Sequence, residues 1–427
     1  MTTIGQEAFH PMPPDYFDYA YEKLISFASQ ITNLLASDFP IPTTRRALVA
    51  VQDIFSREID RITSLRSDST EIKKSACANA NLKIRKFLPL LGFVLRSTNV
   101  RNSFEIAEPL TRLAKQLLKR ELTFILSSEW DFSPLTYNFS FVELPDVILL
   151  GLPSFESANA LMVPLVGHEL GHWIWRDEDM ESRLSSRLED NIVNAFLDGW
   201  SAFQRIFGRD VDIGDIRTSM FAREIWTISF ADSMRQCEEV FSDFVGLKLF
   251  GASYLHSFEY LTAPFTGEPR SREYPDMKTR AEFLSSAVDF FSFAFPSGYA
   301  DHFENSTTEN GPADRFLIEA SDAATRATVQ DLLDLTVEIS AKRTFPSLSE
   351  QESEFCLTRI KSGVPAEGVE YIGNIINAGW SAYRDNTLLG PSSPGRRRID
   401  ILNELLLKSI EVAEFEVRMR DADAAYS

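Results

Sequence analysis

Two histidines stand four residues apart around a glutamate in the segment His168-Glu169-Leu170-Gly171-His172, although the chain of 427 residues has only five histidines. This is the H-E-x-x-H pattern of zinc hydrolases. On an α-helix, positions i and i+4 lie on one face, so both imidazoles can bind one tetrahedral cation while Glu169 faces its open coordination position. The segment predicts a catalytic Zn²⁺ site with Glu169 as the general base.

A catalytic zinc ion needs three protein ligands and one open position, so a third ligand must lie elsewhere in the chain. The metzincin pattern would place a histidine six residues after His172, after a glycine at position 175. The chain has Trp175 and Glu178 at these positions, which excludes the metzincin arrangement and leaves Glu178 only as a candidate ligand.

A downstream segment offers a better third ligand. Glu239, Asp243 and Gly246 recur at i, i+4 and i+7, on one face of a predicted helix. Glu239 can bind the metal, and Asp243 can accept the outer N–H of one of the two ligand histidines. Glu238 would serve as the ligand if the helix were rotated, but it has no aspartate at i+4. We expect Gly246 to allow close packing against the motif helix.

The two motifs, H-E-x-x-H at 168–172 and E-x-x-x-D at 239–243, resemble those of the gluzincin metallopeptidases, which are thermolysin-like in the broad sense. The resemblance covers roughly residues 137–280. It implies a zincin-like fold, zinc ligation by His168, His172 and Glu239, Glu169 as the general base, and Asp243 behind a ligand histidine. The G-x-M-E-N motif of the aminopeptidase branch is absent, so no subfamily is assigned.

Helices must position most of these residues, because apolar side chains recur at helical spacing through much of the chain. Strand patterns stand just before the motif, at 137–144 and 146–151. Helices are predicted over 16–127, 157–175, 179–207 and 218–250, with more in the C-terminal part. The predicted fold is mainly α (α+β): an N-terminal helical region at 1–130, a zincin-like catalytic core with a small sheet at 131–300, and a C-terminal helical region at 301–427.

The composition limits the partners. Lys and Arg number 43 against 62 Asp and Glu, a net charge of -19, which argues against nucleic acid or an anionic membrane surface as the main partner. No stretch reaches the roughly 18 apolar residues of a membrane span, and the N-terminus has no secretion signal pattern. Cys77, Cys237 and Cys356 suit free buried thiols in a reducing compartment, so we expect a cytoplasmic protein.

Two functions fit these features. The first is a zinc metallopeptidase that hydrolyses peptide bonds of a peptide or protein substrate, with Glu169 accepting the proton of the attacking water. The alternative is a zincin-fold regulatory or interaction protein with restricted or no general protease activity, because helical regions flank the core on both sides. Intact Glu169 favours the first, since a structural zinc needs no base. Five downstream residues are candidates to stabilise an oxyanion: Tyr254, His256, Tyr260, Tyr274 and Arg280.

Overall fold

The computed structural model describes residues 16–39, 42–97, 104–129, 135–136, 144, 146–153, 159–208, 211–263, 270–295, 297–306, 311–385 and 398–426. The chain forms two compact units. The first comprises residues 1–102, 123–129 and 137–151, and the second comprises residues 103–122, 130–136 and 152–427. Helices dominate both units, and the strands are few and short, so the predicted mainly helical fold with a small sheet is confirmed.

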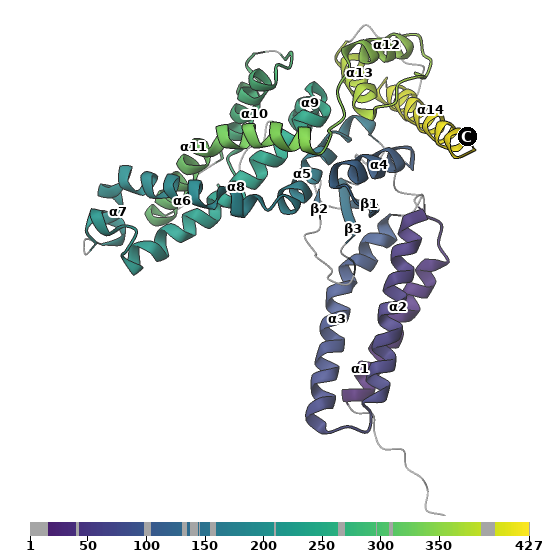
Figure 1. Ribbon diagram of the computed structural model, residues 1–427, viewed down its shortest axis with the longest axis horizontal. Coiled ribbons are helices and arrows are strands. Elements are labelled where there is room, and N and C mark those ends of the chain that lie inside the picture. The colour runs from purple at the N-terminus through teal and green to yellow at the C-terminus, as the bar shows by residue number, and fades with distance from the viewer. Residues whose placement is uncertain are drawn as a thin grey trace, which may run out of the picture. The chain divides into compact units, whose positions relative to one another are not determined.

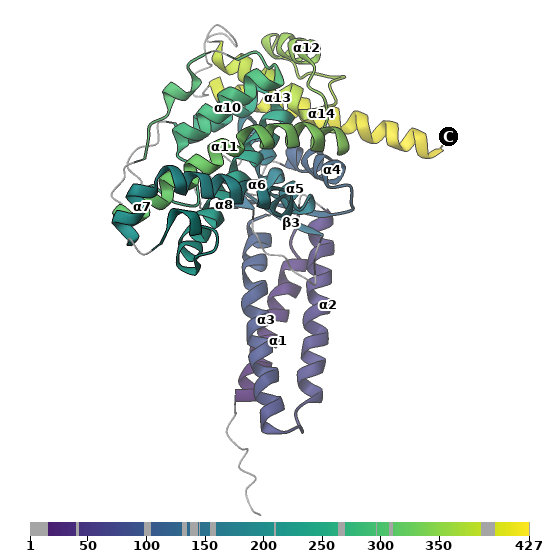
Figure 2. The ribbon, with the colours of Figure 1, turned by 60° about the vertical axis from the view of Figure 1, so that its left-hand side comes forward.

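Three long helices build the first unit: α1 (Tyr16–Leu35), α2 (Pro42–Ser64) and α3 (Thr70–Arg96). They run alongside one another in both ribbon views (Figures 1 and 2). Their shared core is apolar, with Leu24, Phe55 and Phe87 fully buried. The amphipathic spacing seen in the sequence therefore closes this bundle.

The sheet contains β1 (Thr123–Glu129), β2 (Leu135–Thr136) and β3 (Val147–Pro153), in the order β1-β3-β2. Strand β3 confirms the prediction at 146–151. The all-helical prediction for the N-terminal region is wrong at β1, because the run Thr123-Phe124-Ile125 favours a strand. Of the predicted strand 137–144, all but Leu144 lies outside the described residues.

The second unit holds the remaining helices, and its C-terminal part is integral to it. Helix α11 packs along α8 and α6, and Ser229 and Ser233 on α8 donate to the carbonyls of Leu317 and Ser321. Residues 152–300 of the predicted core and the predicted region 301–427 thus belong to this unit, whereas residues 137–151 of the predicted core belong to the first. Its helices are α4 (Ala107–Leu118), α5 (Leu165–Asp177), α6 (Met180–Asp198), α7 (Trp200–Phe207), α8 (Met220–Phe250), α9 (Ala252–Thr262), α10 (Met277–Phe291), α11 (Pro312–Lys342), α12 (Glu350–Lys361), α13 (Ile372–Arg384) and α14 (Arg398–Tyr426).

The helices around the motifs lie close to their predicted places. Helix α8 matches the prediction at 218–250, and the Ser219 side chain caps it by accepting from the Ala222 amide. The predicted helix 157–175 begins later, at Leu165, after a short 3-10 turn at Ala160–Met162. The predicted helix 179–207 is divided at Gly199 into α6 and α7.

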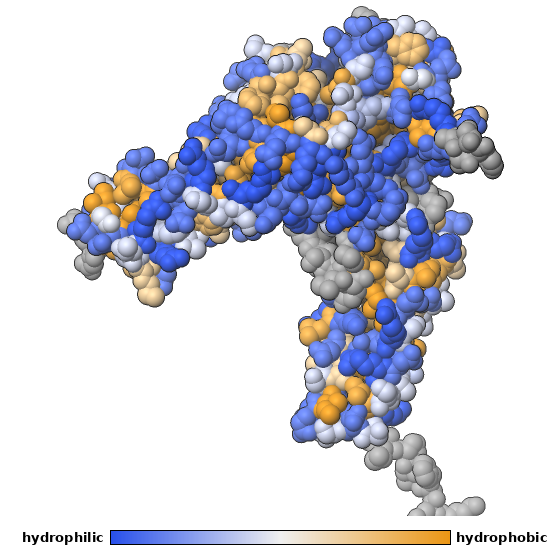
Figure 3. Space-filling view, viewed as in Figure 1, coloured by the Kyte–Doolittle hydropathy of each residue, from blue (hydrophilic) through white to orange (hydrophobic). Residues whose placement is uncertain are grey.

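The surface in Figure 3 is mostly hydrophilic on the face shown, in keeping with the charge of -19. Among the helices that the structure describes, none is both long and apolar enough to cross a membrane. All three cysteines are buried and none forms a disulfide, as predicted.

Candidate metal centre

Helices α5 and α8 carry the two motifs, and glycines bring their backbones into contact. A Cβ on Gly167 would lie 2.9 Å from the Cα of Gly246, and a Cβ on Gly171 would lie 2.6 Å from the Cα of Ser242. Gly246 also has a second role, since a Cβ there would meet the Tyr254 ring at 2.4 Å. The expected close approach at Gly246 is present, and the glycines that permit it from α5 are Gly167 and Gly171.

The predicted ligand atoms converge. The Nε2 atoms of His168 and His172 lie 3.2 Å apart, and the Glu239 carboxylate lies 3.4 Å from the first and 3.6 Å from the second. Ligands bound to zinc at about 2.0–2.1 Å in a tetrahedral arrangement are separated by roughly 3.3–3.5 Å. The first distance ends on Oε2 of Glu239 and the second on Oε1, and one donor atom from each of the three residues lies within 4.8 Å of the others, so this group could hold a metal ion.

Each histidine is oriented by its own carboxylate. The Nδ1 atom of His168 lies 2.9 Å from Oδ1 of Asp243, and Nδ1 of His172 lies 2.9 Å from Oε1 of Glu238. A carboxylate accepts, so each Nδ1–H donates, and the two Nε2 atoms are left facing each other and Glu239. At 3.2 Å the two Nε2 atoms cannot both be unprotonated without a cation, which is either a proton on one of them or a metal ion bound by both.

The role of Glu238 differs from the one considered in the sequence, where it competed with Glu239 as a ligand. The structure places it behind His172, and Arg235 pairs with its other oxygen. The sequence contained a signal for this role, because metal-binding histidines commonly donate their outer N–H to a carboxylate, and Asp243 can orient only one of the two histidines. Of the two adjacent glutamates on α8, Glu239 can bind a metal ion while Glu238 orients His172.

Asp243 is the most heavily bonded group of the centre. Arg280 on α10 donates to it from Nε at 2.8 Å and Nη2 at 2.7 Å, and the Tyr254 hydroxyl on α9 donates at 2.6 Å. Burial alone would raise the pKa of Asp243, but Arg280 and His168 outweigh it and hold that pKa well below its ordinary value. Arg280 and Tyr254 were candidates to stabilise an oxyanion, and both instead bind Asp243.

The electrostatics of the centre favour a cation. Burial would lower the pKa of His168, but its bonds to Asp243 and Glu239 raise it to about 10. Burial would likewise raise the pKa of Glu239, but the two histidines and Arg280 lower it to about 2. A site that holds a proton this strongly without a metal offers the same negative potential to a metal ion.

Glu169 lies on α5 and is 5% exposed. No hydrogen bond or ion pair joins its carboxylate to another residue in the described parts of the chain. Glu178 is held elsewhere by Arg343 and Lys342, each at 2.6 Å, and is not part of the donor group.

The remaining oxyanion candidates take other positions. His256 and Tyr260 line a separate cavity on α9. Tyr274 is 43% exposed, and its carbonyl accepts from Arg270.

The chain matches no protein-family model, no curated protein and no solved structure. The evidence for this centre is its geometry: three donors from two helices, each histidine oriented by a carboxylate.

Proposed function

We propose that this protein is a zinc-dependent metallopeptidase with a zincin-like core of the gluzincin type. The observation that supports the proposal best is that each of the two histidines is hydrogen-bonded to its own outer carboxylate. His168 and His172 direct their Nε2 atoms at the Glu239 carboxylate while their Nδ1 atoms bind Asp243 and Glu238. A histidine in an ordinary core needs no such pair of outer carboxylates, whereas metal-ligating histidines commonly have them.

Zinc suits this donor set, because two imidazole nitrogens and one carboxylate oxygen are the ligands of many catalytic zinc sites. When bound, zinc would lower the pKa of a coordinated water toward about 7 and polarise a carbonyl. Asp243 and Glu238 would keep each ring in the tautomer whose Nε2 is unprotonated. Arg280 and Tyr254 would fix Asp243 in turn.

Glu169 is the proposed general base. It follows His168 directly on α5, so it lies about 100° around the helix from that ligand. Its buried carboxylate forms no hydrogen bond or ion pair with another described residue, which leaves an oxygen able to accept the proton of the attacking water. The same oxygen would then pass that proton to the nitrogen of the leaving amine. The proposed substrate is a peptide or protein, and the cytoplasmic location stays a prediction.

The test compares wild type with Glu169→Gln by zinc content and by cleavage of a peptide library. We expect Glu169→Gln to retain one zinc ion per chain and to lose at least about 10²–10⁴-fold in turnover. Glu224→Gln, an exposed change on α8, is the matched control and should cleave as wild type does. Full activity of Glu169→Gln would remove Glu169 from its role. Zinc-loaded wild type that cleaves no peptide would instead support the regulatory alternative.

A further inference from the structure

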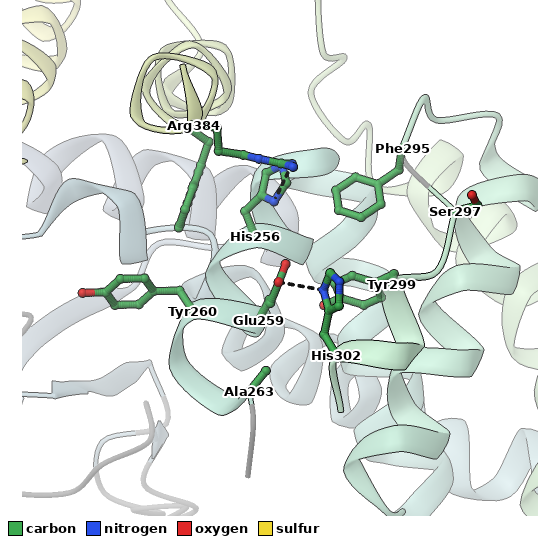
Figure 4. A pocket seen from close by; sticks show the side chains of 10 residues that line it. His256, Glu259, Tyr260, Ala263, Phe295, Ser297, Tyr299, His302 and Arg384 are labelled. Carbon is green, nitrogen blue, oxygen red and sulfur yellow. Dashed lines mark hydrogen bonds and ion pairs between the residues drawn. The ribbon is translucent and has the colours of Figure 1, made fainter. Parts of the chain in front are cut away.

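A separate cavity of about 540 Å³ opens in the second unit, between α9, α13 and four further residues, Phe295, Ser297, Tyr299 and His302 (Figure 4). Its volume lies within the range of about 300–1,000 Å³ typical of small-molecule sites. None of the metal-centre residues lines it. Its occupant must therefore be inferred from the cavity's own side chains.

Helix α9 separates this cavity from the metal centre. Tyr254 and Phe258, one turn apart, contact Asp243 and Arg280. His256, Glu259 and Tyr260 belong to a different face of the same helix and line the cavity. The two sites therefore use different faces of one helix.

Aromatic rings form the walls of the cavity. The His256 ring lies 4.9 Å from the centroid of Phe295 and 5.4 Å from that of Trp380. Tyr260 packs edge-on against Trp380 at 6.1 Å, and Tyr299 packs in the same way against Phe295 at 5.4 Å. Such walls favour a flat aromatic ligand, because rings stack or meet edge to face at these separations.

Arg384, an exposed residue at the cavity, is bound by a histidine and not by a carboxylate in the part of the chain that the structure describes. Nη1 of Arg384 donates to Nε2 of His256 at 2.8 Å (Figure 4). Burial, and then the charge of Arg384, lower the pKa of His256 to about 4, so the ring is a neutral acceptor near pH 7. The acidic side chain of the cavity, Glu259, pairs with His302 at 2.8 Å. Among the described residues, no carboxylate forms an ion pair with Arg384.

We propose that this cavity binds a small aromatic anion, whose ring lies against the aromatic walls and whose carboxylate or phosphate pairs with Arg384. A guanidinium can offer two parallel N–H donors to either group. The neutral His256 ring holds the guanidinium in place without neutralising it. The proposal does not depend on the metallopeptidase activity.

Zinc-loaded full-length protein should be titrated with 2-naphthoate, its neutral analogue 2-naphthamide, and 2-naphthyl phosphate, with binding followed by calorimetry. We expect saturable binding in which at least one anion binds tenfold or more tightly than the amide. The tighter of the two anions identifies the acidic group that the site prefers. Arg384→Met should abolish the advantage of the anions, and Tyr260→Ala, a change at a 40% exposed ring, should weaken all three probes.

Arg187→Met removes an exposed arginine from α6 and serves as the charge control, which should bind as wild type does. The absence of saturable binding by any of the probes would overturn the proposal. Unchanged binding of the anions to Arg384→Met would also overturn it, because the probes would then be bound elsewhere, for example at zinc.

Discussion

Gly171→Ala tests how closely α5 and α8 must pack to build the metal centre. The added Cβ would lie 2.6 Å from the Ser242 Cα, and ordinary contact begins at 3.4 Å, so the helices would have to separate by about 0.8 Å. Since the opposing atom is backbone, no rotamer change relieves the clash. Overpacking a protein core costs about 1–3 kcal/mol, and we expect about 2–3 kcal/mol for this clash. Alanine regains about 1 kcal/mol of helix propensity. The free energy of unfolding should therefore fall by about 1–2 kcal/mol.

Separating α5 from α8 would also move apart the side chains that could hold the metal ion. His172 follows Gly171 on α5, and Glu239 stands one turn before Ser242 on α8. Metal sites tolerate ligand displacements of about ±0.2 Å, so a shift of about 0.8 Å should weaken zinc binding at least about tenfold, or 1.4 kcal/mol.

Urea unfolding of the metal-free protein measures the stability loss, and competition with a chromophoric chelator measures the loss of zinc affinity. Gly214→Ala is the control, because a Cβ at Gly214 meets nothing within 4 Å. If Gly171→Ala matched wild type in both measurements, the inferred contact between the two helices would be refuted.

Three further predictions concern buried charges. Glu238→Gln should weaken zinc about 10–100-fold in chelator competition, because the amide holds His172 less strongly than the carboxylate does. Arg280→Met should lower the free energy of unfolding by about 3–5 kcal/mol in urea, because Asp243 would stay buried without its main countercharge. Glu58 in the first unit has its pKa lowered below 4.5 by its ion pairs with Arg61 and Lys83, which outweigh the effect of burial. A lowered folded-state pKa stabilises above pH 4.5, and this stabilisation disappears as the pH falls through the folded value. Thermal unfolding of Glu58→Gln should therefore lack this part of the acid sensitivity of wild type.

Each of these predictions has a result that contradicts it. Glu238→Gln with wild-type zinc affinity would show that His172 needs no outer carboxylate. Arg280→Met with wild-type stability would show that Asp243 is not buried as a charge, and Arg187→Met is its exposed control. Equal acid sensitivity of Glu58→Gln and wild type would exclude a contribution from that ion pair.

The three residues that could hold a metal ion were predictable because their spacing lies within single helices. His168 and His172 are fixed by the four-residue spacing of one helix, and Glu239 by the helical face that it shares with Asp243. Both motif segments are helical in the structure, and their donors meet. The pattern could also predict Asp243 as an outer partner, but not which histidine it binds.

The rest of the centre depends on packing between segments. Arg280 and Tyr254 stand on α10 and α9, and only the approach of these helices to α8 brings both to Asp243. The spacing of residues along the sequence does not predict which helices pack against each other. The aromatic cavity could not be predicted for the same reason, because its lining residues come from separate segments between positions 256 and 384. The missed strand β1 has a different cause: its apolar run, Phe124 to Leu126, is too short for residue spacing to distinguish a strand from part of a helix.

Anomalous X-ray scattering at the zinc edge, from crystals of the full chain grown with equimolar zinc, tests the metal centre most directly. We expect one peak per chain, about 2.0–2.2 Å from Nε2 of His168, Nε2 of His172 and a carboxylate oxygen of Glu239. Asp243 and Glu238 should remain bound to the two Nδ1 atoms. A zinc peak at other residues, or no peak at these three, would contradict the proposed site.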